Sequence, residues 1–422
     1  MSMANPQPAL PDPDPAEREV SQQVEARVRK AIVRAGGAIG FDRYMSIALY
    51  EPGMGYYAGG RRKFGAAGDF VTAPELSPLF GACVAAQLVR WLPALAPCIW
   101  EFGAGSGALA AQILSELDAL GHDTVEYRII ELSAELRARQ QATLAATHPQ
   151  ALERVQWRAA LPDRIDGIVL ANELLDALPV ELFAMENGEL KERVVELAPG
   201  PAHDVSRGSR HHVDREGPPL APGLRLGSRA PDAAFARRVQ ARLARAGWPD
   251  TLPLGAYQSE IGEQASAWVS SVAERLGTGV MLLIDYGFPA AEFYHPARAS
   301  GTLNCHYRHR SHADPLWSPG LCDITAHVDF SAVHDAATGA GLNCLGYGAQ
   351  SAFLLGCGLA DLFPLRASSA DPAARVRAAQ ALQLLVSEAE MGELFKVIAF
   401  GSDPAFEPLL LNGRDRRAVL IP

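Results

Sequence analysis

Short apolar runs alternate with longer helix-like stretches along most of the chain. The apolar runs have the length and composition of strands and cover residues 99–102, 126–132, 154–158, 167–171, 280–284, 342–346 and 395–400. Helical patterns mark the stretches before and between these runs, at residues 17–35, 77–91, 108–117, 134–147 and 258–276. Strands that alternate with helices predict a mostly parallel sheet with helices on both faces.

Three segments interrupt this alternation. Residues 181–195 predict a hairpin that turns at Glu186-Asn187-Gly188, and residues 203–231 have the polar, Pro- and Gly-rich composition of a surface insertion. The His- and Arg-rich residues 286–330 directly follow a strand and form a candidate substrate wall. We expect a disordered tail at 1–16, a helical cap and lid at 17–95, the core at 96–185, the hairpin and surface insertion at 186–255, and the rest of the core at 256–422.

Composition narrows the class of protein. The 422 residues are 48% hydrophobic and carry a net charge of −10, which is typical of a folded chain and argues against a non-specific nucleic-acid binder. There is no apolar run of membrane-spanning length, and the N-terminus lacks the order of a signal peptide or an Arg-rich presequence. The six cysteines show no paired spacing. We therefore expect a cytoplasmic protein with reduced thiols.

A turn of three alternating glycines, Gly103, Gly105 and Gly107, links an apolar run to a helix-like run. Glycines let backbone N–H groups approach a ligand closely, as in both NAD and S-adenosylmethionine sites. Glu101 lies two residues before the turn, where a pyrophosphate would be repelled and the cationic groups of S-adenosylmethionine would be favoured. Glu131 follows the next strand and suits the ribose of either ligand.

Asn172, Glu173 and Asp176 come directly after the run at 167–171. Since ligands of parallel sheets bind beyond the carboxyl ends of the strands, these side chains are candidates for contact with the reacting group. The structural alternative is a helix start, capped by Asn172 with both acids in its first turn.

A second acidic segment, with Asp69, Thr72 and Glu75, precedes the helix-like run at 77–91. These residues suit helix capping and ligand contact equally well. His327 and Asp329 could orient a substrate or accept a proton, although packing explains them too. Asp285 and Tyr286 follow the strand at 280–284, where they would form the floor of a pocket.

Several motifs together are similar to those of class I S-adenosylmethionine methyltransferases, and more narrowly to the MidA family, which includes the mitochondrial complex I assembly methyltransferase. The motifs span nearly the whole chain and read Leu49-Tyr50-Glu51-Pro52-Gly53-Met54-Gly55-Tyr56-Tyr57, Gly68-Asp69-Phe70-Val71-Thr72-Ala73-Pro74-Glu75, Glu101-Phe102-Gly103-Ala104-Gly105-Ser106-Gly107, Asn172-Glu173-Leu174-Leu175-Asp176-Ala177-Leu178-Pro179-Val180, Asp285-Tyr286-Gly287, Thr325-Ala326-His327-Val328-Asp329-Phe330 and Met391-Gly392-Glu393-Leu394-Phe395-Lys396-Val397.

The resemblance implies a Rossmann-like methyltransferase sheet with strand order 3-2-1-4-5-7-6, the last strand antiparallel, and S-adenosyl-L-methionine as cofactor. It also implies methylation of an arginine in a peripheral-arm subunit of complex I. We expect the cofactor on Glu101, Gly103, Gly105, Gly107, Glu131, Asp69, Thr72 and Asn172. The expected catalytic residues are Glu173, Asp176, Asn172 and His327, and the expected substrate wall is formed by Glu75, Tyr286 and Asp329.

Two other functions fit parts of the sequence. A non-catalytic assembly factor could bind the cofactor and hold a respiratory-complex subunit, and an NAD-dependent oxidoreductase would use the same glycine turn. The histidines and cysteines between Cys305 and Cys322 match no standard zinc spacing, so we expect no metal there and favour contact with a partner protein. The oligomeric state stays open, a dimer included.

Overall fold

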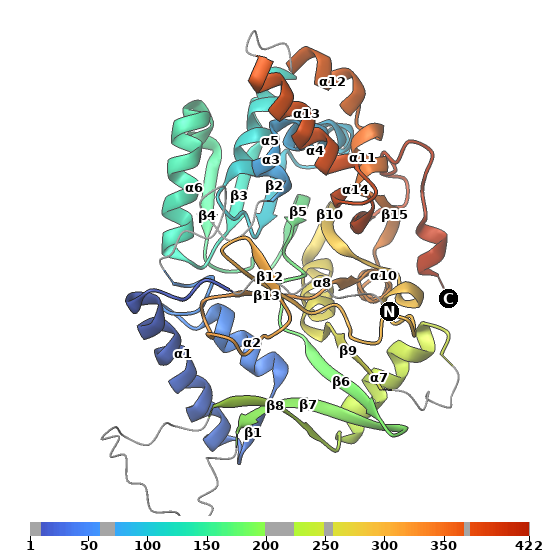
Figure 1. The fold of residues 1–422 in the computed structure, drawn as a ribbon. Coiled ribbons are helices and arrows are strands. Elements are labelled where there is room, and N and C mark those ends of the chain that lie inside the picture. Colours follow the sequence, from blue (N-terminus) through green and yellow to red (C-terminus); the bar gives the residue numbers. More distant parts are fainter. Residues whose placement is uncertain (1–9, 60–71, 199–222, 249–255, 367–371, 422) are drawn as a thin grey trace, which may run out of the picture.

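The computed structural model describes residues 10–59, 72–198, 223–248, 256–366 and 372–421, and the fold is built around a central sheet. Its main strands follow the order β15-β16-β10-β5-β2-β3-β4 (Figure 1). Their bounds are β2 Cys98–Phe102, β3 Glu126–Ile130, β4 Val155–Arg158, β5 Ile165–Asn172, β10 Leu276–Phe288, β15 Asn343–Ala349 and β16 Phe395–Gly401. Within this path, β16 alone runs opposite to the other strands. The predicted order 3-2-1-4-5-7-6 is confirmed.

Alternate residues of the central strands enter two separate hydrophobic cores. Ile168 and Leu170 face one core, whereas Val169 and Ala171 face the other. The first core is covered by α4 Pro78–Trp91, α5 Ala108–Ala119, α6 Ala134–Thr147 and α11 Gln350–Gly356, and the second by α8 Glu263–Arg275 and α10 Phe330–Gly339. Burial on both faces explains why the strands have continuous apolar runs.

A second, antiparallel sheet forms most of the cap, below the central sheet in Figure 1. It consists of β1 Ala38–Gly40, β6 Glu181–Glu186, β7 Glu189–Leu197, β8 Leu224–Arg229 and β9 Tyr257–Ile261. Apolar side chains of α1 Pro15–Arg34 and α2 Phe41–Tyr50 pack in one core with this sheet, and those of α7 Ala233–Arg245 and α9 Ala290–Phe293 pack in another. The predicted hairpin is the β6–β7 pair.

The insertion at 286–330 carries a small third sheet, in the order β12-β11-β13. Its strands are β11 Asn304–Tyr307, β12 Arg310–His312 and β13 Asp323–Thr325, and β14 Val328–Asp329 then pairs with β10. The remaining elements are α3 Ala73–Leu76, α12 Leu359–Arg366, α13 Pro372–Val386, α14 Met391–Leu394 and the short 3-10 helices Leu92–Ala94, Pro149–Arg154 and Arg417–Leu420. Within the described ranges, every helix is too short or too polar to span a bilayer.

Four predicted assignments differ from the structure. The helix expected at 258–276 begins only at Glu263, because the preceding residues pair with β6 as a strand. The surface insertion at 203–231 ends in β8, while its residues 203–222 lie outside the described residues. The helix α4, placed in the predicted cap, packs into the core of the central sheet. The predicted tail at 1–16 falls mainly on residues 1–9, outside the described residues, and α1 already begins at Pro15.

Candidate active site

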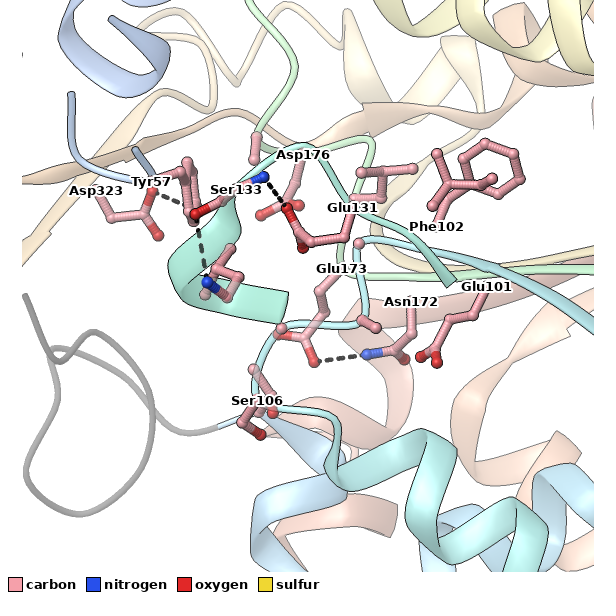
Figure 2. A pocket seen from close by; sticks show the side chains of 18 of the residues that line it. Tyr57, Glu101, Phe102, Ser106, Glu131, Ser133, Asn172, Glu173, Asp176 and Asp323 are labelled. Atoms are coloured by element: carbon pink, nitrogen blue, oxygen red, sulfur yellow. Dashed lines mark hydrogen bonds between the residues drawn. The ribbon is translucent and has the colours of Figure 1, made fainter. Parts of the chain in front are cut away.

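A cavity of about 1180 Å³ opens at the carboxyl ends of the central strands. One part of its lining comes from the residues that follow β2 and β3, and another from the loop after β5, from Tyr286 on β10 and from the cap. Figure 2 shows Glu101, Glu131, Asn172, Glu173 and Asp176 around the same space. Side chains more than 70 positions apart in sequence therefore share one site.

The glycine turn forms one wall of this cavity. Gly103, Gly105 and Gly107 have φ angles of 70°, 52° and 82°, in the left-handed region that favours glycine. A Cβ atom on Gly107 would lie 3.0 Å from the Cα atom of Gln140. The turn therefore needs glycine for both its backbone conformation and its close contact with α6, and its smooth surface fits the close approach of a cofactor.

Glu101 is buried at the end of β2, where its Oε2 atom accepts a hydrogen bond from the Tyr127 hydroxyl at 2.9 Å. Burial raises the pKa of Glu101 to about 7, and the Tyr127 hydrogen bond partly opposes that rise. A cationic ligand group beside this carboxylate would favour its ionised form. This environment suits a cationic ligand better than a pyrophosphate.

Glu131 follows β3, and its carboxylate is fixed from two sides. Oε1 accepts a hydrogen bond from the Ser133 backbone N–H at 2.8 Å, and Oε2 accepts one from Nε2 of Gln140 at 3.0 Å. The carboxylate lines the cavity and retains acceptor capacity for the paired hydroxyls of a ribose. Sequence reasoning missed Gln140, which lies in the middle of a polar helix and matches no motif.

The segment after β5 is a loop and not a helix, so the helix-start explanation of its acids is wrong. Glu173 has a φ of 52°, and its Oε1 atom accepts hydrogen bonds from the Asn172 Nδ2 atom at 3.1 Å and the Ala73 N–H at 3.4 Å. Figure 2 shows Asn172 and Glu173 pointing toward each other. A strained backbone at a cavity wall is typical of a functional site.

Two buried carboxyl groups in this loop are difficult to ionise. Burial raises the pKa of Glu173 to about 8, and repulsion from Asp176 adds to the rise. Burial likewise raises the pKa of Asp176 to about 6, although a hydrogen bond from the Tyr286 hydroxyl to its Oδ2 atom, 2.5 Å long, favours the charged form. At neutral pH Glu173 is therefore mainly protonated and Asp176 mainly ionised, and an incoming cation would displace the Glu173 proton.

Asp285 supports the loop from beneath. Its Oδ2 atom accepts the backbone N–H groups of Leu174, Leu175 and Asp176 at 3.2, 2.9 and 3.3 Å. Burial and the neighbouring carboxyl groups raise the pKa of Asp285 well above its usual range. The expectation of a pocket floor is met by Tyr286, which lines the cavity, while Asp285 lies behind the lining.

Of the other predicted site residues, some line the cavity and some do not. Thr72 and His327 line the cavity, and burial lowers the pKa of His327 to about 4, so its ring is neutral at physiological pH. Asp329 instead caps α10, accepting the N–H groups of Ser331 and Ala332, and both Asp329 and Glu75 lie outside the lining. Their expected place in the wall is not what the structure shows. Asp69 lies outside the described residues.

The outer part of the cavity contains residues that the sequence did not single out as ligands. Asp323 accepts a hydrogen bond from the Tyr57 hydroxyl at 2.8 Å, and the Tyr57 ring stacks on Tyr50 with centroids 5.5 Å apart. The carboxylates in the described lining are Glu101, Glu131, Glu135, Glu173, Asp176 and Asp323, and that described lining contains no Lys or Arg. The cavity therefore favours cationic ligands.

The cysteines and histidines between 305 and 322 have different surroundings, although Cys305 and His312 are cross-strand neighbours in the third sheet. Cys305 is buried in the core of the cap, and His312 packs edge-on against Trp317 with centroids 5.6 Å apart. His306 lies at the cavity instead. Among the residues that the structure describes, no group of three His, Cys, Asp or Glu side chains is arranged to hold a metal ion.

Comparison with known proteins connects this geometry to a chemistry. A family model described as "Putative S-adenosyl-L-methionine-dependent methyltransferase" matches residues 83–348. A protein from Burkholderia thailandensis, whose crystal structure contains S-adenosyl-homocysteine, is 44% identical; the match covers 97% of this chain and 100% of that chain, with a TM-score of 0.85. S-adenosylmethionine is thus the cofactor, and the NAD alternative is wrong.

Curated relatives include protein arginine methyltransferase NDUFAF7 of Danio rerio, 28% identical over 389 residues, with 86% of this chain and 83% of that protein covered. The Homo sapiens protein of the same name is 28% identical over 416 residues, with 92% and 85% covered. Both are named mitochondrial, as is the Drosophila melanogaster homologue. These relatives point to the mitochondrion, so the prediction of a cytoplasmic location is wrong. The chain belongs to the matched family of S-adenosylmethionine-dependent methyltransferases.

Proposed function

We propose that this methyltransferase modifies an arginine side chain of a protein. The observation that carries the proposal is the charge of the cavity. Its described lining holds carboxylates from residues 101–136, which we call the cofactor wall, and from the opposite side, but no Lys or Arg. A guanidinium is a planar cation that carboxylates recognise in bidentate fashion. The names of the relatives, which are protein arginine methyltransferases, point to the same acceptor.

The glycine turn and Glu131 fit the cofactor. The three glycines at positive φ leave the backbone bare at these positions, and a carboxylate held by Ser133 and Gln140 faces the same space. We assign Gly103, Gly105 and Gly107 to the cofactor's backbone contacts, Glu131 to its ribose, and Glu101 and Asn172 to its charged end. The bound cofactor would supply an electrophilic methyl group on a sulfonium.

Glu173 and Asp176 are the groups that would hold the guanidinium. Both belong to one loop, whose backbone is fixed by Asp285, and Tyr286 holds the Asp176 carboxylate by a hydrogen bond. Two fixed carboxylates can orient one nitrogen of the guanidinium toward the cofactor wall and neutralise the charge on the others.

Proton balance favours Glu173 as the acceptor. An arginine enters as a cation and must lose one proton when its nitrogen gains a methyl cation. Glu173 has a pKa raised to about 8, whereas His327 has a pKa lowered to about 4. A base is most effective when its pKa lies near the working pH, so the proton passes to the Glu173 carboxylate. His327 contacts the Tyr286 ring edge-on, with centroids 5.1 Å apart, and acts as an orienting group.

The candidate protein substrate is the complex I peripheral-arm subunit that the sequence resemblance implies. Its test is methyl transfer from isotope-labelled S-adenosylmethionine to that subunit, followed by mass spectrometry of the modified residue. Methylarginine formed by the native chain, and lost in Glu173→Gln, supports the proposal. Methylation of another residue type would contradict it.

The non-catalytic assembly factor is the second candidate, because a fixed carboxylate cluster could also clamp an arginine without modifying it. Complementation of a deletion strain separates the two functions. An assembly factor would restore the respiratory complex without any methylarginine appearing in the subunit. An enzyme would leave methylarginine there, and the deletion strain would lack it.

A further inference from the structure

Gln140 lies completely buried in α6, between the cofactor wall and the edge of the central sheet. Its Nε2 atom donates to the Gly105 carbonyl at 3.2 Å and to Oε2 of Glu131 at 3.0 Å. Its Oε1 atom accepts the indole N–H of Trp157 at 2.9 Å. One amide therefore joins the segments that follow β2 and β3 to the strand β4.

The chemistry of these partners fixes the orientation of the amide. Gly105 and Glu131 offer only acceptor oxygens here, and the Trp157 indole is only a donor. Reversing the amide would place its oxygen against two acceptors and its NH₂ group against a donor. Both donor hydrogens and the carbonyl are thus committed, and in a buried position each lost bond would leave a polar group unsatisfied.

Close packing adds to this constraint. A Cβ atom on Gly107 would lie 3.0 Å from the Gln140 Cα atom and 3.3 Å from its Cβ atom, so the turn and α6 are in direct contact at this point. The Gln140 side chain leaves α6 here and reaches the carbonyl of Gly105 and the carboxylate of Glu131. Two cofactor-facing groups that follow different strands are therefore held at one mutual distance.

We propose that Gln140 is a positioning residue for cofactor binding, which sets the Glu131 carboxylate in register with the glycine turn. The inference rests on the proposed ribose contact of Glu131. Without Gln140, the Ser133 N–H still holds Oε1 of Glu131, but Oε2 can rotate away from the turn. Affinity for the cofactor then falls, while the groups that hold the acceptor stay in place.

The test compares Gln140→Met with Gln87→Met by calorimetric titration with S-adenosyl-homocysteine. Gln87 is also a completely buried glutamine, and it accepts the Leu410 N–H at 2.7 Å, outside the cavity lining. Loss of a hydrogen bond to a charged group should weaken binding of S-adenosyl-homocysteine to Gln140→Met about tenfold, with less than about a twofold change in Gln87→Met. The KM for S-adenosylmethionine should rise with the dissociation constant, and kcat at saturating cofactor should change little.

Equal affinities of Gln140→Met and the native chain, or equal losses in both variants, would overturn the proposal. If Gln140→Met does not fold, Trp157→Phe is tested in its place, because it removes only the donor to Oε1 of Gln140. Trp157→Phe should also bind S-adenosyl-homocysteine more weakly than the native chain. Unchanged affinity would contradict the positioning role of Gln140. Glu131→Ala separates the ribose contact of Glu131 from its positioning by Gln140. Unchanged binding of S-adenosyl-homocysteine by Glu131→Ala would refute the ribose contact. Weak binding by Glu131→Ala together with native affinity of Gln140→Met would refute only the positioning role of Gln140.

Discussion

The Asp285 carboxylate accepts the backbone N–H of Leu175 at 2.9 Å, although the two residues lie 110 positions apart in the chain. The same oxygen also accepts the N–H groups of Leu174 and Asp176. These bonds hold the loop between β5 and β6 in a non-helical path, with Glu173 at a positive φ. The geometry of the candidate catalytic carboxylates thus depends on a side chain that lies behind the cavity wall.

Asp285→Ala should therefore reduce both stability and activity. Loss of the acceptor leaves buried N–H groups unsatisfied, and the free energy of unfolding should fall by about 3 kcal/mol, measured by denaturant titration. Methyl transfer should fall more than the folded fraction does, because Glu173 loses its support. Asp232→Ala is the control. It removes the N-cap of α7, whose carboxylate accepts the Phe235 N–H at 2.7 Å, and should lower stability less than Asp285→Ala does, without loss of activity in the folded protein.

Glu173→Gln should lower kcat by about a hundredfold or more, since it removes one negative charge and the proton acceptor while keeping the size of the side chain. Binding of S-adenosyl-homocysteine should be nearly unchanged, as measured by calorimetry. Glu116→Gln replaces a buried glutamate of α5 that lies outside the lining and should retain native kcat. A fall in cofactor affinity equal to the fall in kcat would argue against the assigned role.

The raised pKa of Glu173 predicts a pH-dependent rate. A guanidinium binds the ionised carboxylate, so kcat/KM for the acceptor should rise with pH and level off above about pH 8, the pKa of the free protein. Rates measured with Glu173→Gln should lack this limb. A profile that falls over the same range would contradict the proposed proton acceptor.

Stability should show the opposite pH trend. The folded state binds the Glu173 proton more tightly than the unfolded state. The contribution of Glu173 to native stability is therefore largest below the ordinary glutamate pKa and is lost as pH rises through about 8. In thermal melts without ligand, the melting temperature of Glu173→Gln should therefore rise relative to that of the native chain between about pH 5 and 8. A constant difference in melting temperature across that range would show that the carboxyl group is not protonated in the native state.

Gly107→Ala should abolish cofactor binding, because the new Cβ atom meets the Gln140 backbone at 3.0 Å and the residue has a φ of 82°. Gly121→Ala is closely matched: its φ is 83°, but no atom lies within 4 Å of the new Cβ. The free energy of unfolding of both variants should fall by about 1 kcal/mol, because alanine is disfavoured in the left-handed region. Only Gly107→Ala should lose S-adenosyl-homocysteine binding in calorimetry. Equal binding by the two variants would show that the contact with α6 is not required.

The sequence was sufficient for the central sheet because its strands are buried on both faces and its helices follow the period of one packing surface. It failed at Tyr257–Ile261, where periodicity suggested helix but pairing with β6 determines the conformation. That pairing depends on an element more than 70 positions earlier, which local periodicity cannot detect.

The candidate site was predictable where a residue lies at the end of a strand, as Glu101 does, or directly after it, as Glu131 and Glu173 do. Asp323 could not be found in this way, since a three-stranded insertion brings it to the cavity. Asp329 was misplaced for a different reason: the motif it shares with His327 suggested contact with a substrate, but its carboxylate is used by the first turn of α10. Local spacing does not distinguish a capping acid from a cavity acid.

The division of the cavity between two parts of the fold has an evolutionary consequence. The cofactor wall is built within 101–136, whereas much of the opposite wall comes from the cap segment 50–58 and the insertion at 286–330. Mutations that accumulate in these two segments can reshape the entrance for a different protein substrate while the transferred group and its source stay the same. Among homologues that differ in their protein substrate, we expect these two segments to differ most in sequence, and the glycine turn and Gln140 to differ least.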